Sequence, residues 1–416
     1  MRLRALSLPA GAVLLLALLL AGCGGTRLLQ RTETRTRTET APAPAAATAP
    51  AAATAPATAG IPALATRNTT RVDGASPIED AAGVALAVYP SQSAGSHPSA
   101  VTIAPTDDWE AAIAASVLMA APVHAPVLLS GSSALPAATA QALSTLAPTG
   151  AGSLDGAQVI RVGQVPTPRH LKSEAVSRSD NPYALAAAIA RFHAAAAGSA
   201  GSDVVVASTA SPAYAMPAAG WAAESGDPVL FVSASGVPAA TRAALRAVGH
   251  PHIYVLGPAS VVGPGILRTL RRYGRVARVG ATGPAANSVA FATYRDPPCP
   301  YGRACAEIPG SFGWALRSPG HGYTLLNAAR PLDAAASAAL SGSGDYGPQL
   351  LVQDPTTLPK PVLDYFLNYA TPGYSPGEQT AAVYNHGWVI GDPSVISVPV
   401  QSELDTLLQA IPVSSR

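Results

Sequence analysis

Charge is scarce in this chain of 416 residues, because Asp, Glu, Lys and Arg make up only 12% of it and the formal net charge is +2. This balance excludes nucleic-acid binding spread over the whole chain, which requires a strongly basic surface. The length is sufficient for two or three ordinary domains.

The N-terminus combines a short basic segment with an apolar run. Arg2 and Arg4 precede residues 10–21, which are entirely apolar or small and too few for a permanent span of a bilayer. Residues 20–23 read Leu-Ala-Gly-Cys, which resembles the bacterial lipobox. That resemblance implies cleavage before Cys23 and a diacylglycerol on its sulfur, which would hold the mature protein on the outer face of the cytoplasmic membrane. Residues 1–22 are therefore predicted to be a lipoprotein signal peptide; an ordinary signal peptide with a chance cysteine is the alternative.

Residues 23–65 are predicted to form a disordered tether. Thr alternates with Arg and Glu over residues 32–40, and residues 41–59 are almost wholly Ala, Pro and Thr. No part of this segment offers an apolar face that could offset the entropy of ordering the chain. A Pro-rich spacer of about 40 residues reaches on the order of 100 Å, far enough to place the folded part in a cell wall. The Thr clusters fit a bare linker and an O-glycosylated one equally.

A common order of elements recurs three times in the rest of the chain. An apolar strand and an Ala-rich helix open each copy, with the strands at 100–104, 203–207 and 323–326 and the helices at 109–121, 214–224 and 332–340. A proline introduces the second strand, at 126–130, 228–232 and 348–352. Another proline opens the second helix, at 135–146, 237–248 and 358–369. A strand that ends in glycine closes each copy, at 159–163, 253–257 and 388–391.

Short apolar strands that alternate with helices predict parallel sheets buried on both faces. We therefore expect an α/β protein of three tandem modules, in which short parallel sheets are flanked by helices and the three-strand cores are equivalent. The predicted modules are residues 66–168, 169–276 and 277–416. Each spans a whole domain rather than a short solenoid repeat.

This order of elements resembles the type 2 cell wall-binding repeat, found in tandem threes on bacterial surface proteins. Residues 126–130, Pro-Val-Leu-Leu-Ser, match its Pro-Ile-Leu-Leu segment, and Asp333-Ala334 keeps its Asp-Ala pair. Glu110 replaces that Asp in the first copy, the second copy has lost it, and Gly257 and Gly391 each keep one glycine of a paired-glycine turn. The resemblance implies a three-lobed arrangement of α/β modules and non-covalent attachment to an anionic wall polymer.

Motifs of known catalytic or cofactor sites are missing from the sequence. It contains no Gly-x-Ser-x-Gly elbow, Walker loop, His-Glu-x-x-His helix or Gly-x-Gly-x-x-Gly turn. We therefore predict a protein that is not an enzyme and has no cofactor, metal or nucleic-acid partner. His250 and His252 are expected to lie in a loop without metal. Asp107, Asp108 and Glu110 are expected to serve a helix start by capping and by complementing its dipole.

Arginines cluster near the second module boundary. Arg268, Arg271, Arg272 and Arg275 are spaced i, i+3, i+4 and i+7, so they share one face if a helix extends that far. In a chain so poor in charge, this patch is our candidate contact for a polymer that carries phosphate or carboxylate groups. The alternative is a solvated helix face that Gly274 ends early.

The other two cysteines, Cys299 and Cys305, are predicted to form a local disulfide. They are close in sequence, and the compartment outside the cytoplasmic membrane is oxidising. A metal pair is disfavoured because no His or further Cys lies at ligand spacing.

These features predict a lipid-anchored extracytoplasmic protein that binds peptidoglycan or an anionic polymer of the cell wall non-covalently. A solute-binding lipoprotein of a transporter is one alternative, although such proteins usually have two lobes and this chain repeats three times. An envelope hydrolase with a dispersed site is the other.

Overall fold

The computed structural model describes residues 62–298, 311–343, 347–374 and 383–412. All of them belong to one compact unit, Ala55–Arg416. The predicted signal peptide, Cys23, the tether up to residue 61, Cys299 and Cys305 lie outside the described residues, so lipidation and the disulfide stay predictions. No described helix is both long and apolar enough to cross a membrane.

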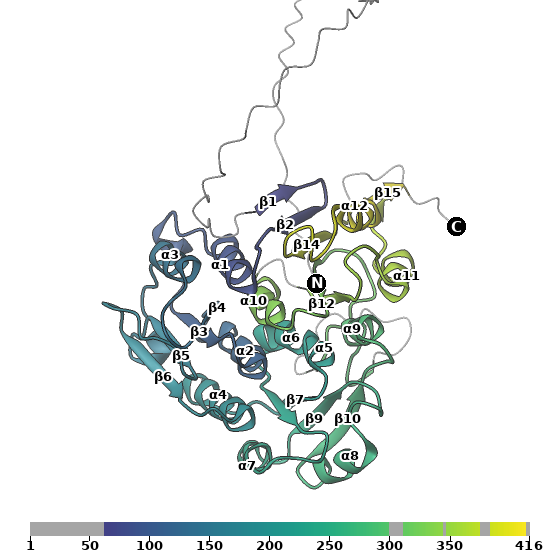
Figure 1. Ribbon diagram of the computed structural model, residues 1–416. Helices are drawn as coiled ribbons and strands as arrows, with labels where there is room; N and C mark the ends of the chain where they lie inside the picture. The colour runs from purple at the N-terminus through teal and green to yellow at the C-terminus, as the bar shows by residue number, and fades with distance from the viewer. Residues whose placement is uncertain (1–61, 299–310, 344–346, 375–382, 413–416) are drawn as a thin grey trace, which may run out of the picture. The chain divides into compact units, whose positions relative to one another are not determined.

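Three mainly parallel sheets are built from equivalent strands (Figure 1). The first has the order β4-β3-β5-β6 and consists of β3 (Val101–Pro105), β4 (Val127–Ser130), β5 (Val159–Val162) and β6 (Ser173–Ser177). The second has the order β8-β7-β9-β10 and consists of β7 (Asp203–Ser208), β8 (Val229–Val232), β9 (His252–Leu256) and β10 (Arg275–Val279). The third has the order β12-β11-β14-β2-β1 and consists of β11 (Gly322–Asn327), β12 (Gln349–Val352), β14 (His386–Ile390), β2 (Thr69–Val72) and the antiparallel β1 (Pro62–Ala65).

The predicted α/β class and the equivalence of the three cores are confirmed. The strands that follow a proline, β4, β8 and β12, each pair in parallel with the first strand of their own copy and lie at the sheet edge. All their residues are buried, as expected for parallel strands that are covered on both faces.

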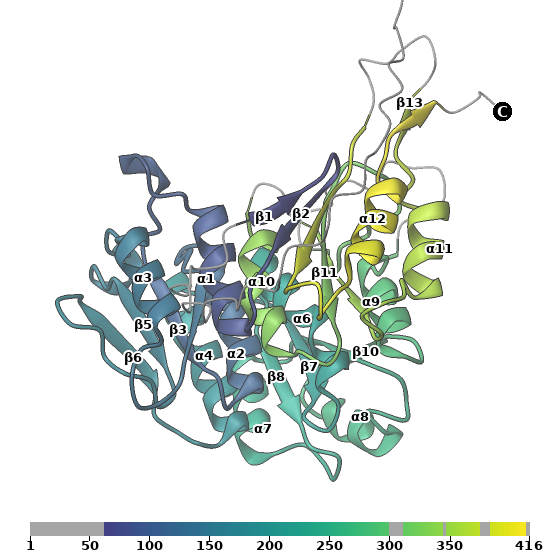
Figure 2. The same ribbon diagram turned by 45° about the horizontal axis from the view of Figure 1, so that its top comes forward.

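The N-terminal part of the unit completes the third sheet. β2 pairs in parallel with β14, although more than 300 residues separate Val72 from Ile390, and it occupies the place that β6 and β10 take in the other sheets. Both views show β1 and β2, in purple, beside the yellow β14 (Figures 1 and 2). The predicted module boundaries are staggered against these sheets: the first falls between β5 and β6, and the second falls inside β10. The fourth strand thus opens the next predicted copy in the first sheet, crosses the boundary in the second, and comes from the first copy in the third.

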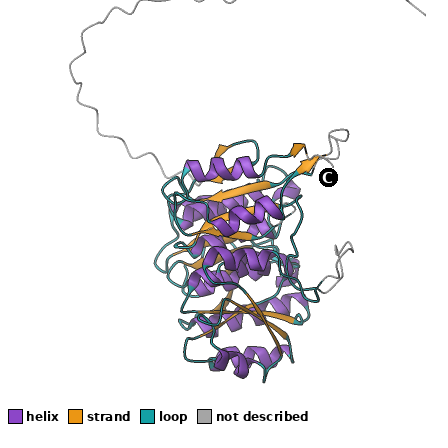
Figure 3. Ribbon diagram, turned by 90° about the vertical axis from the view of Figure 1, so that its right-hand side faces the viewer, coloured by secondary structure: helices purple, strands orange, loops and turns teal. Residues whose placement is uncertain are grey.

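Helices cover both faces of the strands (Figure 3). The fourth strands lead into α1 (Pro77–Val88), α4 (Pro182–Ala197) and α9 (Pro284–Ala292), each with proline in its first turn. The first strands lead into α2 (Trp109–Ala115) with the 3₁₀ turn η2 (Ser116–Met119), α5 (Pro212–Ala215) with α6 (Pro217–Ser225), and α10 (Leu332–Ser341). The second strands lead into α3 (Ala137–Leu146), α7 (Ala239–Val248) and α11 (Lys360–Asn368). The remaining elements are η1 (Ala94–Ser96), η3 (Gly152–Leu154), α8 (Pro264–Leu270), α12 (Val398–Leu407), β13 (Gly373–Tyr374) and β15 (Ile411–Pro412).

The helices that follow the first strands pack against one another between the sheets. α10 contacts α6 and α2, and α6 contacts η2. Their buried faces are largely alanine, including Ala112, Ala219 and Ala335. Small side chains allow the helices to approach closely, which explains why this alanine-rich sequence forms a shared core.

Candidate functional site

The strand order creates a topological switch point at the carboxyl ends of the strands in each sheet. The first strand of each copy lies between the second and the third strand of that copy. The connections that leave the carboxyl ends of the first and the third strand therefore run in opposite directions. In open parallel sheets, ligands bind at such a point. A glycine with positive φ follows the third strand in every copy: Gly163 at 70°, Gly257 at 101° and Gly391 at 96°. At Gly391 a Cβ would lie 2.9 Å from Val395, so this turn requires glycine.

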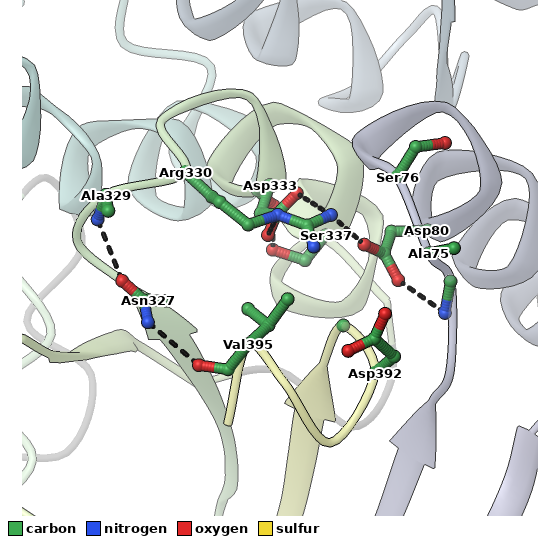
Figure 4. Close-up of polar contacts among 12 residues, drawn as sticks. Ala75, Ser76, Asp80, Asn327, Ala329, Arg330, Asp333, Ser337, Asp392 and Val395 are labelled. Atoms are coloured by element: carbon green, nitrogen blue, oxygen red, sulfur yellow. Dashed lines mark hydrogen bonds and ion pairs between the residues drawn. The ribbon is translucent and has the colours of Figure 1, made fainter. Parts of the chain in front are cut away.

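In the third sheet a buried cluster of charged side chains lies at this switch point (Figure 4). Arg330 follows β11, Asp333 lies in the first turn of α10, and Asp80 lies in the first turn of α1. Nη2 of Arg330 is 2.6 Å from Oδ2 of Asp80, and its Nε is 2.8 Å from Oδ2 of Asp333. Both carboxylates are fully buried, whereas the Arg330 side chain is 17% exposed.

Burial dominates the protonation of the two carboxyl groups. It raises the pKa of Asp80 to about 8, assisted by the charge of Asp333 and opposed by the charge of Arg330. It also raises the pKa of Asp333 to about 7, against the influence of Arg330. Two buried carboxyl groups share one guanidinium, so the cluster retains a proton near neutral pH.

The protein itself satisfies the groups around this cluster. The backbone N–H of Gly74 donates to Asp80 over 3.0 Å. Asn327 donates to the carbonyl of Val395 over 2.8 Å, and Asp392 accepts a hydrogen bond from the backbone N–H of Ser394. The arrangement therefore ties α1 to α10 through Arg330.

The sequence singled out Asp333 through the Asp-Ala pair but missed both of its partners. Asp80 is 250 positions from Arg330, and nothing local links them. Asp80 lies three residues after Pro77, the proline that opens α1. At the same position after their own opening prolines, the equivalent helices α4 and α9 have Leu185 and Asn287. A lone acid at a position occupied by uncharged residues in the other copies is the signal that could have identified it.

We expect the free energy of unfolding to fall as pH rises from about 4 to about 8, in part because of this cluster. The folded state holds protons on Asp80 and Asp333 that the unfolded chain releases, because an aspartate there has its ordinary pKa of 3.8. This stabilisation is complete below pH 3.8 and is lost as pH rises through the folded-state pKa values. Asp333→Asn removes about one of these protons, so between pH 5 and 7 the free energy of unfolding should fall less steeply with pH. The expected change in slope is roughly 1.4 kcal/mol per pH unit.

Urea unfolding of wild type and variant across this range measures the slope. Asp364→Asn is the matched control, because Asp364 pairs with Lys360 on an exposed helix face. An unchanged slope in Asp333→Asn would show that the cluster does not hold the proton.

The four arginines do not share one continuous helical face, because the helix ends early, which is the alternative that the sequence left open at Gly274. α8 ends at Leu270, Arg271 caps it, and Arg275 already belongs to β10. The chain turns early because Gly274 lies against Pro251, where a Cβ would be 2.0 Å from the carbonyl oxygen. Arg268, Arg271, Arg272 and Arg275 are all exposed nonetheless, and Arg275 lies 3.9 Å from the carboxylate of Asp296. Their role in polymer binding stays a prediction.

The capping role of Asp108 is confirmed. Its Oδ1 accepts a hydrogen bond from the backbone N–H of Ala111 over 2.8 Å at the start of α2. Burial raises the pKa of the neighbouring Glu110 to about 7. His252 is the first residue of β9 and not part of a loop as expected, and its Nδ1 lies 3.0 Å from Asp203. Within the described ranges, no three His, Cys, Asp or Glu side chains are arranged to hold a metal ion.

Neither a family model nor a curated protein matches the chain. Solved structures with a similar fold include two proteins of Clostridium difficile. Cwp8 from Clostridium difficile aligns with a TM-score of 0.59 at 14% identity, covering 82% of this chain and 52% of Cwp8. Cwp6 from Clostridium difficile aligns with a TM-score of 0.57 at 14% identity, covering 82% of this chain and 48% of Cwp6. The chain thus spans about half the length of each, and at this identity the likeness establishes the fold alone.

Proposed function

We propose that this protein is a lipid-anchored, non-enzymatic protein that binds the cell wall non-covalently through an anionic polymer. The observation that carries the proposal is the set of three equivalent α/β sheets, whose fold is shared with two cell wall proteins, Cwp8 and Cwp6. The resemblance of the sequence copies to the type 2 cell wall-binding repeat and the lipobox before Cys23 support it independently.

The buried charge cluster argues against the hydrolase alternative at the switch point of the third sheet. A pair of carboxyl groups with raised pKa values would suit general acid–base chemistry. Asp80 and Asp333 are however fully buried and both engaged by Arg330. A polymer substrate cannot reach them. The threefold architecture likewise differs from the two lobes of a solute-binding lipoprotein.

The anchor is tested by Cys23→Ser in the full chain, followed by fractionation of the cells. We expect the wild-type protein in the membrane fraction and the variant largely in the soluble fraction or medium, because the variant cannot receive the lipid. Equal membrane association of both proteins would contradict the anchor. A membrane wash at high salt separates lipid anchoring from charge-based adsorption.

Wall binding through the arginine patch is tested with Glu at positions 268, 271, 272 and 275. Guanidinium groups bind phosphate and carboxylate through paired donors, so we expect at least a tenfold loss of sedimentation with purified walls. Wild-type binding should also weaken as salt approaches 1 M, because exposed charges more than about 3 Å apart are then largely screened from each other. The matched control places Glu at four other exposed arginines: Arg169, Arg178, Arg191 and Arg317. Equal binding by both variants would remove the patch from consideration.

A further inference from the structure

A polar cavity of about 360 Å³ lies at the amino end of the third sheet, opposite the buried charge cluster. Its walls come from the residues that immediately precede or begin three neighbouring strands. They are Arg67 and Asn68 before β2, Gly320 and His321 before β11, and Tyr384, Asn385 and His386 at β14. None of the described lining residues is acidic. The cavity thus combines segments from both ends of the folded unit.

Two buried asparagines hold the cavity walls in place. The side-chain oxygen of Asn385 accepts a hydrogen bond from the backbone N–H of Gly320 over 2.8 Å, and its amide donates to the carbonyl of Ala370 over 2.6 Å. Asn68 makes two hydrogen bonds to Asp405 of α12, one from its backbone N–H over 2.7 Å and one from its side chain over 2.9 Å. The loops that carry Arg67 and His321 are therefore fixed before any ligand arrives.

The two strongest donors in the cavity remain available. Arg67 is exposed and has no hydrogen-bond or ion-pair partner within the described part of the chain. The imidazole of His321 is half-buried, and its polar atoms likewise have no partner among the described residues. Burial lowers the pKa of His321, so the ring is neutral near pH 7 and has one N–H to donate. His386 differs, because its Nε2 lies 3.1 Å from the hydroxyl of Thr70.

We propose that this cavity binds a single oxyanion, the phosphate or carboxylate of a sugar-sized acid, between Arg67 and His321. The planar guanidinium of Arg67 offers paired donors to such a group, and the imidazole of His321, which lines the same cavity, adds a third. The volume suits a small ligand, and Tyr384, 64% exposed, provides an aromatic rim. The proposal rests on the proposed function in one respect: it assigns the cavity to one acidic unit of the wall polymer.

The test uses the mature chain from residue 23 with Cys23→Ser, titrated calorimetrically with inorganic phosphate, glucuronate and the neutral sugar glucose. We expect both anions to bind and glucose not to bind. Arg67→Met and His321→Asn should each weaken anion binding at least tenfold, because each removes a donor that has no substitute. Arg178→Met and His250→Asn, at exposed positions elsewhere, should bind as wild type does. Thermal unfolding of each variant verifies that it is folded.

Absence of anion binding by wild type, or unchanged binding by Arg67→Met, would overturn the cavity proposal. Sedimentation of the same proteins with purified walls keeps the two proposals separable. Wild type that binds walls but neither soluble anion retains the proposed function and loses the cavity. Wild type that binds both anions but not walls retains the cavity as an anion site and loses the proposed function.

Discussion

Arg330→Met should lower the free energy of unfolding at pH 7 by about 3–5 kcal/mol, the usual cost of removing one partner from a buried ion pair. Arg330 is the shared counter-ion of Asp80 and Asp333, and both carboxyl groups are fully buried. Without it, the folded state must protonate both groups or bury an unpaired charge. Urea unfolding of the mature Cys23→Ser chain measures the loss.

The pH dependence of that loss identifies its cause. Below about pH 5 the two carboxyl groups are protonated in the folded variant, so the cost of Arg330→Met should shrink. Arg317→Met is the control, because Arg317 is exposed and lies over the ring of Tyr369, and it should change stability by less than about 1 kcal/mol. If Arg330→Met lowered the free energy of unfolding by less than about 1 kcal/mol, the cluster would not be what holds α1 to α10.

Arg71→Met should be comparably severe, at about 3–5 kcal/mol, because three hydrogen bonds from a charged donor are lost together. Arg71 lies in β2 with no exposed surface. Its guanidinium donates to Gln401 over 2.9 Å, to the carbonyl of Gly391 over 2.6 Å and to the carbonyl of Ile396 over 2.7 Å. The substitution therefore leaves buried acceptors without donors and loosens the strand that completes the third sheet.

Arg67→Met is the matched control for stability, since Arg67 stands four residues earlier in the same hairpin but is exposed. It should unfold at the same urea concentration as wild type. If Arg71→Met did so too, the pairing of β2 with β14 would not depend on this side chain, and the account of how the N-terminal strand is held would be wrong.

The repeated architecture could be predicted because its signals are local. Each second strand is an apolar run introduced by proline, as at residues 228–232, and burial on both faces leaves no polar alternation to obscure it. The predicted helix at 109–121 and the one at 214–224 are each divided in the structure, the latter at Pro217. Proline has no backbone N–H to donate to the preceding turn, so Pro217 breaks the helix. The sequence alone shows this proline inside the predicted helix.

The completion of the third sheet could not be predicted. β2 reads Thr-Thr-Arg-Val and contains a buried arginine, so it lacks the apolar character of the other central strands. Its partners Gly391 and Gln401 lie more than 300 residues away. The sequence left two possibilities for the arginines, one continuous helical face or a helix that Gly274 ends early, and the tertiary contact between Gly274 and Pro251 decides for the second. Long-range polar contacts determine these features, and periodicity does not report them.

The most direct test of the proposed function is sedimentation of the mature Cys23→Ser chain with purified cell walls, before and after chemical removal of their anionic polymers. We predict that the protein sediments with intact walls at low salt and stays in the supernatant once the polymers have been removed. Equal sedimentation with both preparations, or none with intact walls, would contradict binding of the wall through an anionic polymer.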